Sequence, residues 1–517
     1  MANDKQTEGV TRRDFMKVAA VGAGGAGVAA LGLSTEAKAA PPPPKWDKTV
    51  DVVVAGAGVG GLCAAVRAAT KGCKVVLLEA SRRTGGTGLF SSGLVGFAKG
   101  TDYKKMMETA PYTDPVLGKV VMDNFGNLKQ FLSEVGAPFK ELPPFNWQTY
   151  RLEGYLQLGG KPIPDGPRSF ANGMEDKFEA AGGILMKETK AIGLFQNQTG
   201  RVVGIKAMGK NGMMSIGAKA VILACGSFQN NKELLLRYIS PEADLTAARC
   251  VPYNDGTGLL MGVSAGAILS RSIGTFYGHL VPWPLVIPQN PDSYEAGDAT
   301  SFQELMGNVQ QYAPQSIVIN LNGERFVDES LMDEWINQMT ARQPKARSIV
   351  VFDQTIREKF AGKSAITRRD NLELLLEKGA IVEKADTLDE LAVKLKGLGV
   401  HKANFLKTVK KFNEAVDQKT TADLKIPKNG LIFKIEKPPF YAVPATSGIS
   451  IVYGGLAINP KAEVLGIGQV PISGLYAIPG VAGGIMHTDM WCVMSGNMTF
   501  GYLAAENAAA MVKVKKR

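Results

Sequence analysis

A glycine-rich turn between an apolar strand and a helix constrains this chain more than any other feature. Residues 50–55 are almost all apolar, as in a strand buried within a parallel sheet. Gly56, Gly58 and Gly61 follow in the pattern GxGxxG. Glycines at these positions let the backbone turn sharply and let its N–H groups approach a pyrophosphate at the start of the next helix. The turn therefore predicts a dinucleotide-binding site.

The residues after the turn complete a βαβ unit. We predict a helix over residues 62–71, a glycine cap at Gly72 and a second strand over residues 74–78. Glu79 ends this strand, where an acidic side chain is placed to bond ribose hydroxyls. The GxGxxG pattern alone is a weak signal, but strand, glycines, helix, strand and acid occur here in the required order. The predicted fold class is therefore α/β, with a Rossmann-like domain built on a parallel sheet.

The residues beyond the second strand favour FAD over NAD. Glycine and hydroxyl side chains occupy residues 85–87 and 91–93, which suits a ribityl chain and a flavin ring pressed against the backbone. Residues 201–218 predict a β-ribbon, and residues 220–224 predict a strand that leads to Gly226.

Further motifs follow in order along the chain. They read NDGTGLLMGVSAGA at 254–267, IVINLNGERFVDE at 317–329, GGLAINPKAEVL at 454–465 and MTFGYLAAENAA at 498–509. Together with the glycine turn they make the chain similar, over about residues 48–512, to the flavoprotein family of fumarate reductases, succinate dehydrogenases and 3-ketosteroid Δ1-dehydrogenases.

The resemblance implies a fold and a cofactor site. It implies an FAD-binding domain split into residues 48–272 and 437–517, with a mobile α+β capping domain inserted at 273–436. The substrate is expected where the two meet, against the flavin. The residues expected to contact FAD are Gly56, Gly58, Gly61, Glu79, Ala80, Gly85, Gly86, Thr87, Ser91, Ser92, Gly93, Ala191, Ala224, Gly226, Asp255, Gly480, Gly496 and Asn497.

Two departures from the family concern the flavin. The covalent members attach FAD to a histidine just after the paired glycines, where this chain has Thr87 and Gly88. We therefore expect noncovalent FAD. Gly480 stands where the fumarate reductases carry a glutamate, so one flavin contact of those relatives is missing.

The positive charges that hold a dicarboxylate in the fumarate reductases are missing from the matching motifs. Met332 stands at the position of the arginine acid, and Val493 at that of a carboxylate-binding arginine. Residues 451–453 read IVY in place of a His-Thr-Met run. No Lys or Arg occurs between Lys461 and Lys513. We therefore expect a neutral substrate that is not a dicarboxylate.

Three residues are candidates for catalysis. His279 falls on a substrate-facing histidine of the family, and His487 lies two residues before Asp489 in the loop ahead of the last motif. Tyr453 is a candidate proton donor or carbonyl ligand, with Tyr277 as a second tyrosine. The predicted enzyme is an FAD-dependent oxidoreductase acting on a C–C bond beside a carbonyl or in a ring, as ene-reductase or dehydrogenase.

Two other functions stay open. One is a reductase of an unsaturated acid of the fumarate or urocanate type, held by arginines that the motifs do not identify. The other is a non-catalytic flavin-binding subunit for electron transfer. The chain carries no CxxCH haem motif and no iron–sulfur cysteine pattern, so electrons are expected from a separate carrier such as a periplasmic cytochrome c.

The N-terminus predicts export. Arg12, Arg13 and Lys17 precede an apolar Gly- and Ala-rich run, which resembles a twin-arginine signal over residues 1–39. The run is too short and too rich in glycine for a stable membrane span. We expect cleavage near Ala39, a Pro-rich linker at 40–47 and a periplasmic protein.

Composition argues against two other classes of function. The formal net charge is +11, but the Lys and Arg are scattered, so nucleic acid is not an expected partner. The chain has three His and five Cys with no CxxC pair, and no metal site is expected.

Overall fold

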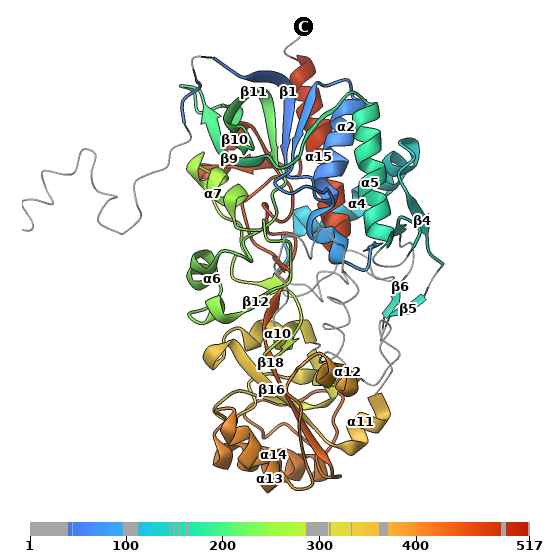
Figure 1. Ribbon diagram of the computed structural model, residues 1–517, viewed down its shortest axis with the longest axis vertical. Coiled ribbons are helices and arrows are strands. Elements are labelled where there is room, and N and C mark those ends of the chain that lie inside the picture. The colour runs from blue at the N-terminus through green and yellow to red at the C-terminus, as the bar shows by residue number, and fades with distance from the viewer. Residues whose placement is uncertain are drawn as a thin grey trace, which may run out of the picture.

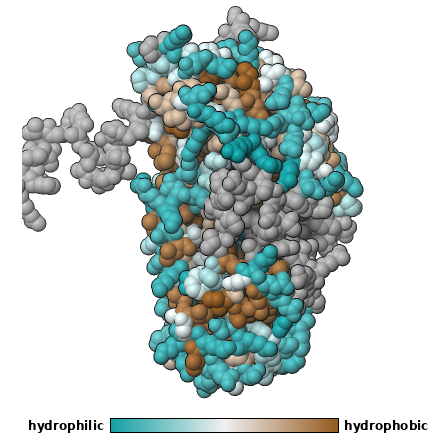
Figure 2. All heavy atoms as spheres, in the orientation of Figure 1, coloured by the Kyte–Doolittle hydropathy of each residue, from teal (hydrophilic) through white to brown (hydrophobic). Residues whose placement is uncertain are grey.

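The computed structural model shows two lobes stacked along the long axis, each with its own apolar core (Figure 1). Hydrophilic side chains cover most of the visible surface of both lobes, with hydrophobic side chains in smaller patches (Figure 2). The residues that the structure describes are 40–43, 45–96, 112–143, 145–147, 150–152, 156–161, 165–285, 309, 312–331, 333–360, 371–487 and 493–514. The predicted export signal lies outside them.

The larger core is built on an eight-stranded sheet in the order β21-β22-β11-β1-β2-β8, with β10 pairing β11 and β9 pairing β10. The pairs β22-β11, β11-β1, β1-β2 and β2-β8 are parallel, and the pairs that involve β9, β10 and β21 are antiparallel. The strands are β1 Lys48–Ala55, β2 Val75–Leu78, β8 Ile184–Met186, β9 Lys190–Gln196, β10 Val202–Gly209, β11 Gly212–Leu223, β21 Glu463–Leu465 and β22 Pro471–Ala477.

Helices from both ends of the chain pack together beside this sheet. They are α2 Val59–Thr70, α4 Pro115–Glu134, α5 Asp165–Ala180 and α15 Val493–Val514 (Figure 1). The close approach of α2 and α15 depends on small residues, because a Cβ on Gly501 would lie 2.3 Å from the carbonyl oxygen of Gly60. The C-terminal helix therefore reaches the first turn of the helix that follows the glycine turn.

The smaller core is built on an antiparallel five-stranded sheet in the order β14-β18-β16-β15, with β17 also pairing β18. Its strands are β14 Val281–Pro282, β15 Ile317–Ile319, β16 Arg347–Phe352, β17 Glu383–Ala385 and β18 Phe440–Thr446. Its helices are α10 Asp333–Thr340, α11 Gln354–Phe360, α12 Asn371–Glu377, α13 Leu388–Gly397 and α14 Lys402–Asp417.

Two short strand pairs lie where the chain passes between the cores. β13 Phe276–Tyr277 pairs with β20 Ile451–Val452, and β12 Ala247–Ala248 pairs with β19 Gly448–Ile449. The remaining elements are α6 Lys232–Tyr238, α7 Thr257–Ser264, β3 Leu94–Val95, β4 Phe139–Glu141, β5 Phe145–Trp147, β6 Tyr150–Leu152, β7 Leu156–Leu158, η2 Gly86–Phe90, η3 Ala243–Leu245, η4 Ala313–Gln315, η5 Glu329–Leu331, η6 Pro344–Ala346 and η7 Ile467–Gln469.

The predicted α/β fold with a parallel sheet is confirmed. The strand, glycine turn, helix and second strand occur where the sequence placed them, and Gly72 adopts the positive φ of +81° expected of a glycine that follows a helix. The predicted ribbon is the antiparallel pair of β10 and β11, and β11 continues without a break into the strand predicted at residues 220–224. The domain boundaries stay a prediction, and the pairing of β18 within the smaller sheet favours a return to the larger core after Thr446. Among the described residues, no helix combines the length and apolarity that a bilayer crossing needs.

Candidate active site

The glycine turn leaves space for a ligand at the N-terminus of α2. A Cβ on Gly56, whose φ is +106°, would lie 2.3 Å from the carbonyl oxygen of Ala224. A Cβ on Gly61 would lie 2.0 Å from the carbonyl oxygen of Gly56. Gly58 differs, because a Cβ there would meet nothing within 4 Å. Two of the glycines are therefore required by the protein itself, and the third faces open space where backbone N–H groups favour a pyrophosphate.

Glu79 is held beside this turn by the backbone. One carboxylate oxygen accepts the N–H of Ala57 at 2.8 Å, and the other accepts the N–H of Ser81 at 2.8 Å. Burial raises the pKa of Glu79, and the backbone hydrogen bonds act in the opposite direction. Each oxygen keeps a lone pair, so the carboxylate fits the predicted role of bonding the ribose of a dinucleotide.

A second set of glycines borders the same space. Gly85 and Gly86 have positive φ, and a Cβ on Gly86 would lie 3.2 Å from the Cα of Gly58. Thr87 Oγ1 accepts a hydrogen bond from Asn254 Nδ2 at 2.9 Å. A Cβ on Gly226 would lie 2.3 Å from Asn254 Oδ1. These contacts fix the loop after Glu79 against the loop after β11, which places small residues along one wall of the space.

The first turn of α15 borders the glycine turn from the other side. A Cβ on Gly60 would lie 2.8 Å from Asn497 Oδ1. Gly496 is buried, and Gly480 has a φ of +100°, with its Cβ position 3.3 Å from the Cα of Gly226. The N-termini of α2 and α15 therefore both lie near the predicted cofactor site, and helix N-termini stabilise negative charge.

The other predicted cofactor residues lie on the loops and strand ends around this space, and their contacts with FAD stay predictions. Asp255 forms an ion pair with Lys190 and accepts the N–H of Thr257, the first residue of α7, at 3.0 Å. The remaining ones are Ala80 after β2, Ser91, Ser92 and Gly93 before β3, Ala191 in β9 and Ala224 after β11. The open space at Gly58 and the fixed Glu79 carboxylate fit FAD.

A hydrogen-bonded group of three side chains joins the two lobes. Tyr277 Oη lies 2.8 Å from His279 Nε2, and His279 Nδ1 bonds to the carboxylate of Asp333. Tyr277 comes from β13 and Asp333 from the first residue of α10. Tyr277 and His279 are partly exposed, while Asp333 is buried. An imidazole bonded on one side to a carboxylate and on the other to a hydroxyl can carry a proton between them.

Burial keeps this group largely uncharged. It lowers the pKa of His279 to about 3, with Arg249 as a second cause, and it raises the pKa of Asp333 to about 7. It also raises the pKa of Tyr277. At neutral pH the imidazole and the phenol are therefore neutral, and Asp333 is protonated in a large fraction of molecules.

A buried arginine that the sequence analysis did not identify lies next to the group. Arg249 is 2% exposed, and burial lowers its pKa to about 10, so it stays charged at neutral pH. Asp333, Glu334 and Tyr277 act in the opposite direction on that pKa. The positive charge is therefore faced by two carboxyl groups of the protein. No motif marks Arg249, because it is brought to the site only by the pairing of β12 with β19.

The three predicted catalytic residues, His279, His487 and Tyr453, have different described contacts, and their roles stay predictions. His279 joins Tyr277 and Asp333, whereas the His487 ring lies 4.7 Å from that of Tyr112. Burial lowers the pKa of His487, and the charges of Arg271 and Arg342 lower it further.

The loop around His487 contains no Lys or Arg of its own, as the sequence shows. Arg271 and Arg342, which come from other segments, nevertheless place positive charge near it. Tyr453 is 2% exposed, and its N–H donates to Thr275. Met332 lies outside the described residues.

His279, Asp333 and Glu334 have the composition of a divalent-metal site, with ligand atoms within 4.8 Å, but both nitrogens of His279 are already bonded. This arrangement favours proton transfer over metal ligation.

A comparison with protein families gives a match that spans most of the chain. The family described as the FAD binding domain matches residues 51–490. The chain belongs to this family. FAD is therefore its cofactor, and the predicted cofactor is confirmed.

Two curated relatives that match most of the chain are named as reductases. The protein named "Probable fumarate reductase Ifc3" from Shewanella frigidimarina is 26% identical, and the match covers 89% of this chain and 75% of that one. The vinyl phenol reductase of Lactiplantibacillus plantarum is also 26% identical, over 84% of this chain and 90% of that one. The chain is an FAD-dependent oxidoreductase that acts on CH–CH groups, as predicted.

A solved structure supports the fold. The 3-ketosteroid delta1-dehydrogenase of Sterolibacterium denitrificans, solved with 1,4-androstadiene-3,17-dione, superposes with a TM-score of 0.71 at 17% identity. The superposition covers 90% of this chain and all of that one. The shared architecture includes both lobes of the present chain, which confirms the predicted fold class.

Proposed function

We propose that this enzyme reduces, or in the reverse direction forms, a carbon–carbon double bond in a neutral substrate, beside a carbonyl or a ring. The observation that carries the proposal is the hydrogen-bonded series Tyr277–His279–Asp333. In the proposed reaction, this series supplies the proton that the charged arginine acid is expected to supply in a fumarate reductase. FAD, held by the glycine turn, Glu79 and the loops at 85–87 and 226, supplies hydride-transfer chemistry when bound.

The series can deliver one proton to a substrate carbon. Protonated Asp333 donates to His279 Nδ1, His279 Nε2–H donates to the oxygen of Tyr277, and the Tyr277 hydroxyl donates to the substrate. The result is one proton lost by Asp333 and one gained by the substrate. The phenol returns to its first state, and the imidazole stays neutral with its hydrogen on Nδ1 instead of Nε2. The partial exposure of Tyr277 and His279 supports their contact with substrate. Each transfer is reversible, so the same series serves a dehydrogenase.

The charges around the series favour a neutral substrate. Arg249 is the buried cation of the group, and Asp333 and Glu334 already face it. A substrate carboxylate placed there would compete for one guanidinium with Glu334, and with Asp333 whenever that carboxyl group is ionised. An unpaired buried charge costs several kcal/mol even after relaxation. Relatives with a phenolic substrate, such as the vinyl phenol reductase, agree with this view.

The proposal is tested by mixing reduced holoenzyme anaerobically with candidate acceptors. We expect 4-vinylphenol or a neutral cyclic enone to reoxidise the flavin rapidly, and fumarate not to do so. Tyr277→Phe removes the terminal donor and should slow this step about 100-fold, as is typical of a lost general acid. Rapid reoxidation by fumarate together with an undiminished rate in Tyr277→Phe would overturn the proposal.

A reductase of an unsaturated acid is the second candidate. Arg249, together with Arg271 and Arg342 near His487, supports it, as does the fumarate reductase relative. The same experiment separates the two, because an acid substrate would reoxidise the flavin and would depend on these arginines.

The remaining expectations stay part of the proposal. They are noncovalent FAD, a capping lobe that closes over the flavin, export through the signal at 1–39 and periplasmic electron supply by a separate carrier such as a cytochrome c. A fumarate reductase that is named as cytochrome-linked is among the relatives, which supports a cytochrome as electron source.

A further inference from the structure

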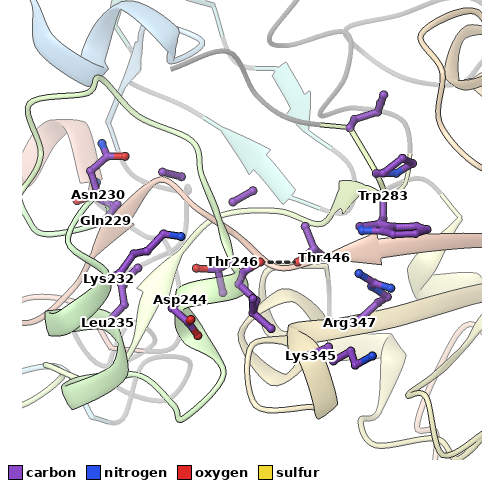
Figure 3. A pocket seen from close by; sticks show the side chains of 15 residues that line it. Gln229, Asn230, Lys232, Leu235, Asp244, Thr246, Trp283, Lys345, Arg347 and Thr446 are labelled. Atoms are coloured by element: carbon purple, nitrogen blue, oxygen red, sulfur yellow. Dashed lines mark hydrogen bonds between the residues drawn. The ribbon is translucent and has the colours of Figure 1, made fainter. Parts of the chain in front are cut away.

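A cavity of about 650 Å³ lies between the two lobes and includes none of the residues of the Tyr277–His279–Asp333 series. One wall comes from α6 and η3 of the larger lobe, and the other from the end of β14, η6 and the start of β16 (Figure 3). The charged residues and two of the large apolar residues of the lining are Lys232, Leu235, Asp244, Trp283, Lys345 and Arg347. A cavity of this volume suits a small organic ligand.

The charges of this cavity are mainly positive and come from both lobes. Lys232 stands at the first turn of α6, and Lys345 and Arg347 stand on the side of the smaller sheet, as Figure 3 shows. Among the described residues of the lining, Asp244 is the one that is acidic. Three cations against one carboxylate favour an anionic ligand.

Arg347 is the most strongly positioned of the cations. Its guanidinium carbon lies 3.9 Å from the centroid of the Trp283 ring, a cation–π contact that holds the group in place. Its Nε atom is buried, and no hydrogen-bond acceptor for it occurs among the residues that the structure describes. That atom is covered by protein, but Arg347 as a residue stays partly exposed and lines the cavity, so a ligand's acidic group can approach its guanidinium.

The uncharged part of the lining combines apolar side chains with the polar residues Gln229, Asn230, Thr246 and Thr446. Leu235 is 2% exposed and forms part of the wall, with Leu245, Pro284 and Leu285. An inorganic anion would satisfy the cations but would leave these surfaces in water. A ligand with an apolar body covers them and gains from their burial.

We propose that this cavity binds an organic anion, a carboxylate or sulfonate with an apolar body, whose acidic group bonds Arg347 and which is also attracted by the positive charge of Lys232 on the opposite wall. The ligand thereby touches both lobes. It lies beside the strands that connect them, since the N–H of Ala247 donates to the carbonyl of Ser447 at 2.8 Å and Thr446 Oγ1 donates to the carbonyl of Leu245 at 3.4 Å. The bound anion restrains movement of one lobe against the other.

The probe for the test is 8-anilino-1-naphthalenesulfonate, an aromatic sulfonate that fluoresces in apolar surroundings. We expect saturable binding of one probe by oxidised holoenzyme. Arg347→Gln should weaken binding at least tenfold, because a hydrogen bond to a charged group is lost. Lys232→Glu, a charge reversal at an exposed position, should also weaken it. Lys410→Gln, at an exposed position of α14, is the matched control and should leave probe binding unchanged.

Two further readouts place the ligand. Hydrogen exchange of peptides covering residues 243–250 and 443–450 should slow when the probe is bound. Tyr277→Phe should leave probe affinity unchanged, and an acceptor that reoxidises the flavin should not displace the probe, so the outcome is independent of the proposed reaction. Unchanged affinity in both Arg347→Gln and Lys232→Glu, displacement by the acceptor, or inorganic sulfate binding as tightly as the probe would each overturn the proposal.

Discussion

His279 and Asp333, 54 residues apart in sequence, are joined by a hydrogen bond between Nδ1 and the carboxylate. The bond brings the histidine from the chain segment beside β13 together with the first residue of α10, and it orients the ring so that Nε2 meets the hydroxyl of Tyr277. Because burial depresses the pKa of the imidazole and raises that of the carboxyl, the pair holds its proton on Asp333 or shares it, and positive charge on the ring is disfavoured.

The first prediction separates the two histidines. His279→Ala should slow flavin reoxidation about 100-fold with a neutral acceptor, because it breaks the path between Asp333 and Tyr277. His487→Ala should have a smaller effect, since His487 lies beside Tyr112 and outside that path. Stopped-flow rates at saturating acceptor, with flavin content as the control for folding, measure both. Equal losses in the two variants would contradict this ranking.

The second prediction concerns pH. Delivery of a proton requires protonated Asp333, whose pKa is about 7, so the reduction rate should be highest below pH 7 and fall as pH rises through that value. The reverse reaction needs the carboxylate and should rise over the same interval.

Asp333→Asn removes the titrating group and should flatten the profile at a low rate. Asp123→Asn, an exposed change on α4, is the matched control and should keep the wild-type profile. A wild-type rate that is constant from pH 5 to 9 would remove Asp333 from the proton path.

Local and tertiary features differ in how well the sequence predicts them. Gly56, Gly58, Gly61 and Glu79 lie within one βαβ unit, where spacing alone determines the geometry, and the structure places them as expected. His401 lies at the start of α14, where its Nδ1 caps the helix by accepting the N–H of Asn404.

No motif marks Arg249, and Asp333 directly follows Met332, where the resemblance points to an arginine and not to a carboxylate. Each becomes part of the site through contacts over long sequence distances, one through the β12–β19 pair and the other through α10. The motifs that lack Lys and Arg therefore do not account for all the positive charge near the candidate site, because Arg249, Arg271 and Arg342 come from other segments of the chain. The preference for a neutral substrate now rests on the carboxyl groups that face Arg249.

The third prediction concerns export. Replacing Arg12 and Arg13 by lysine should keep the FAD-loaded protein in the cytoplasm, because the paired arginines are the predicted recognition feature of the signal. Cell fractionation with flavin fluorescence measures this. Delivery to the periplasm that is unchanged in the double variant would contradict the predicted signal.

The fourth prediction concerns electron supply. The formal net charge of +11 favours an acidic carrier, and attraction between exposed charges is screened over about 10 Å at 0.1 M salt. Reduction of the flavin by an acidic periplasmic cytochrome c should therefore slow as ionic strength rises from 0.02 to about 0.2 M. A basic cytochrome c is the matched control and should react slowly at all salt concentrations. A rate that does not depend on salt with the acidic carrier would exclude electrostatic docking.

The last prediction tests the glycine turn. Gly58 has a φ of −65° and open space around its Cβ position, so Gly58→Val should fold, yet its side chain would occupy the space assigned to the pyrophosphate. We expect purified Gly58→Val to be colourless with a circular dichroism spectrum like that of the wild type. Gly61→Val would instead collide with the carbonyl of Gly56 and should fold poorly. Gly126→Val, at a helix position that also has open space, is the matched control and should stay yellow.

Acid or heat should release all the wild-type flavin as FAD, because Thr87 offers no covalent link. A yellow Gly58→Val protein, or flavin retained by the denatured wild-type chain, would contradict the assigned site or the noncovalent attachment respectively.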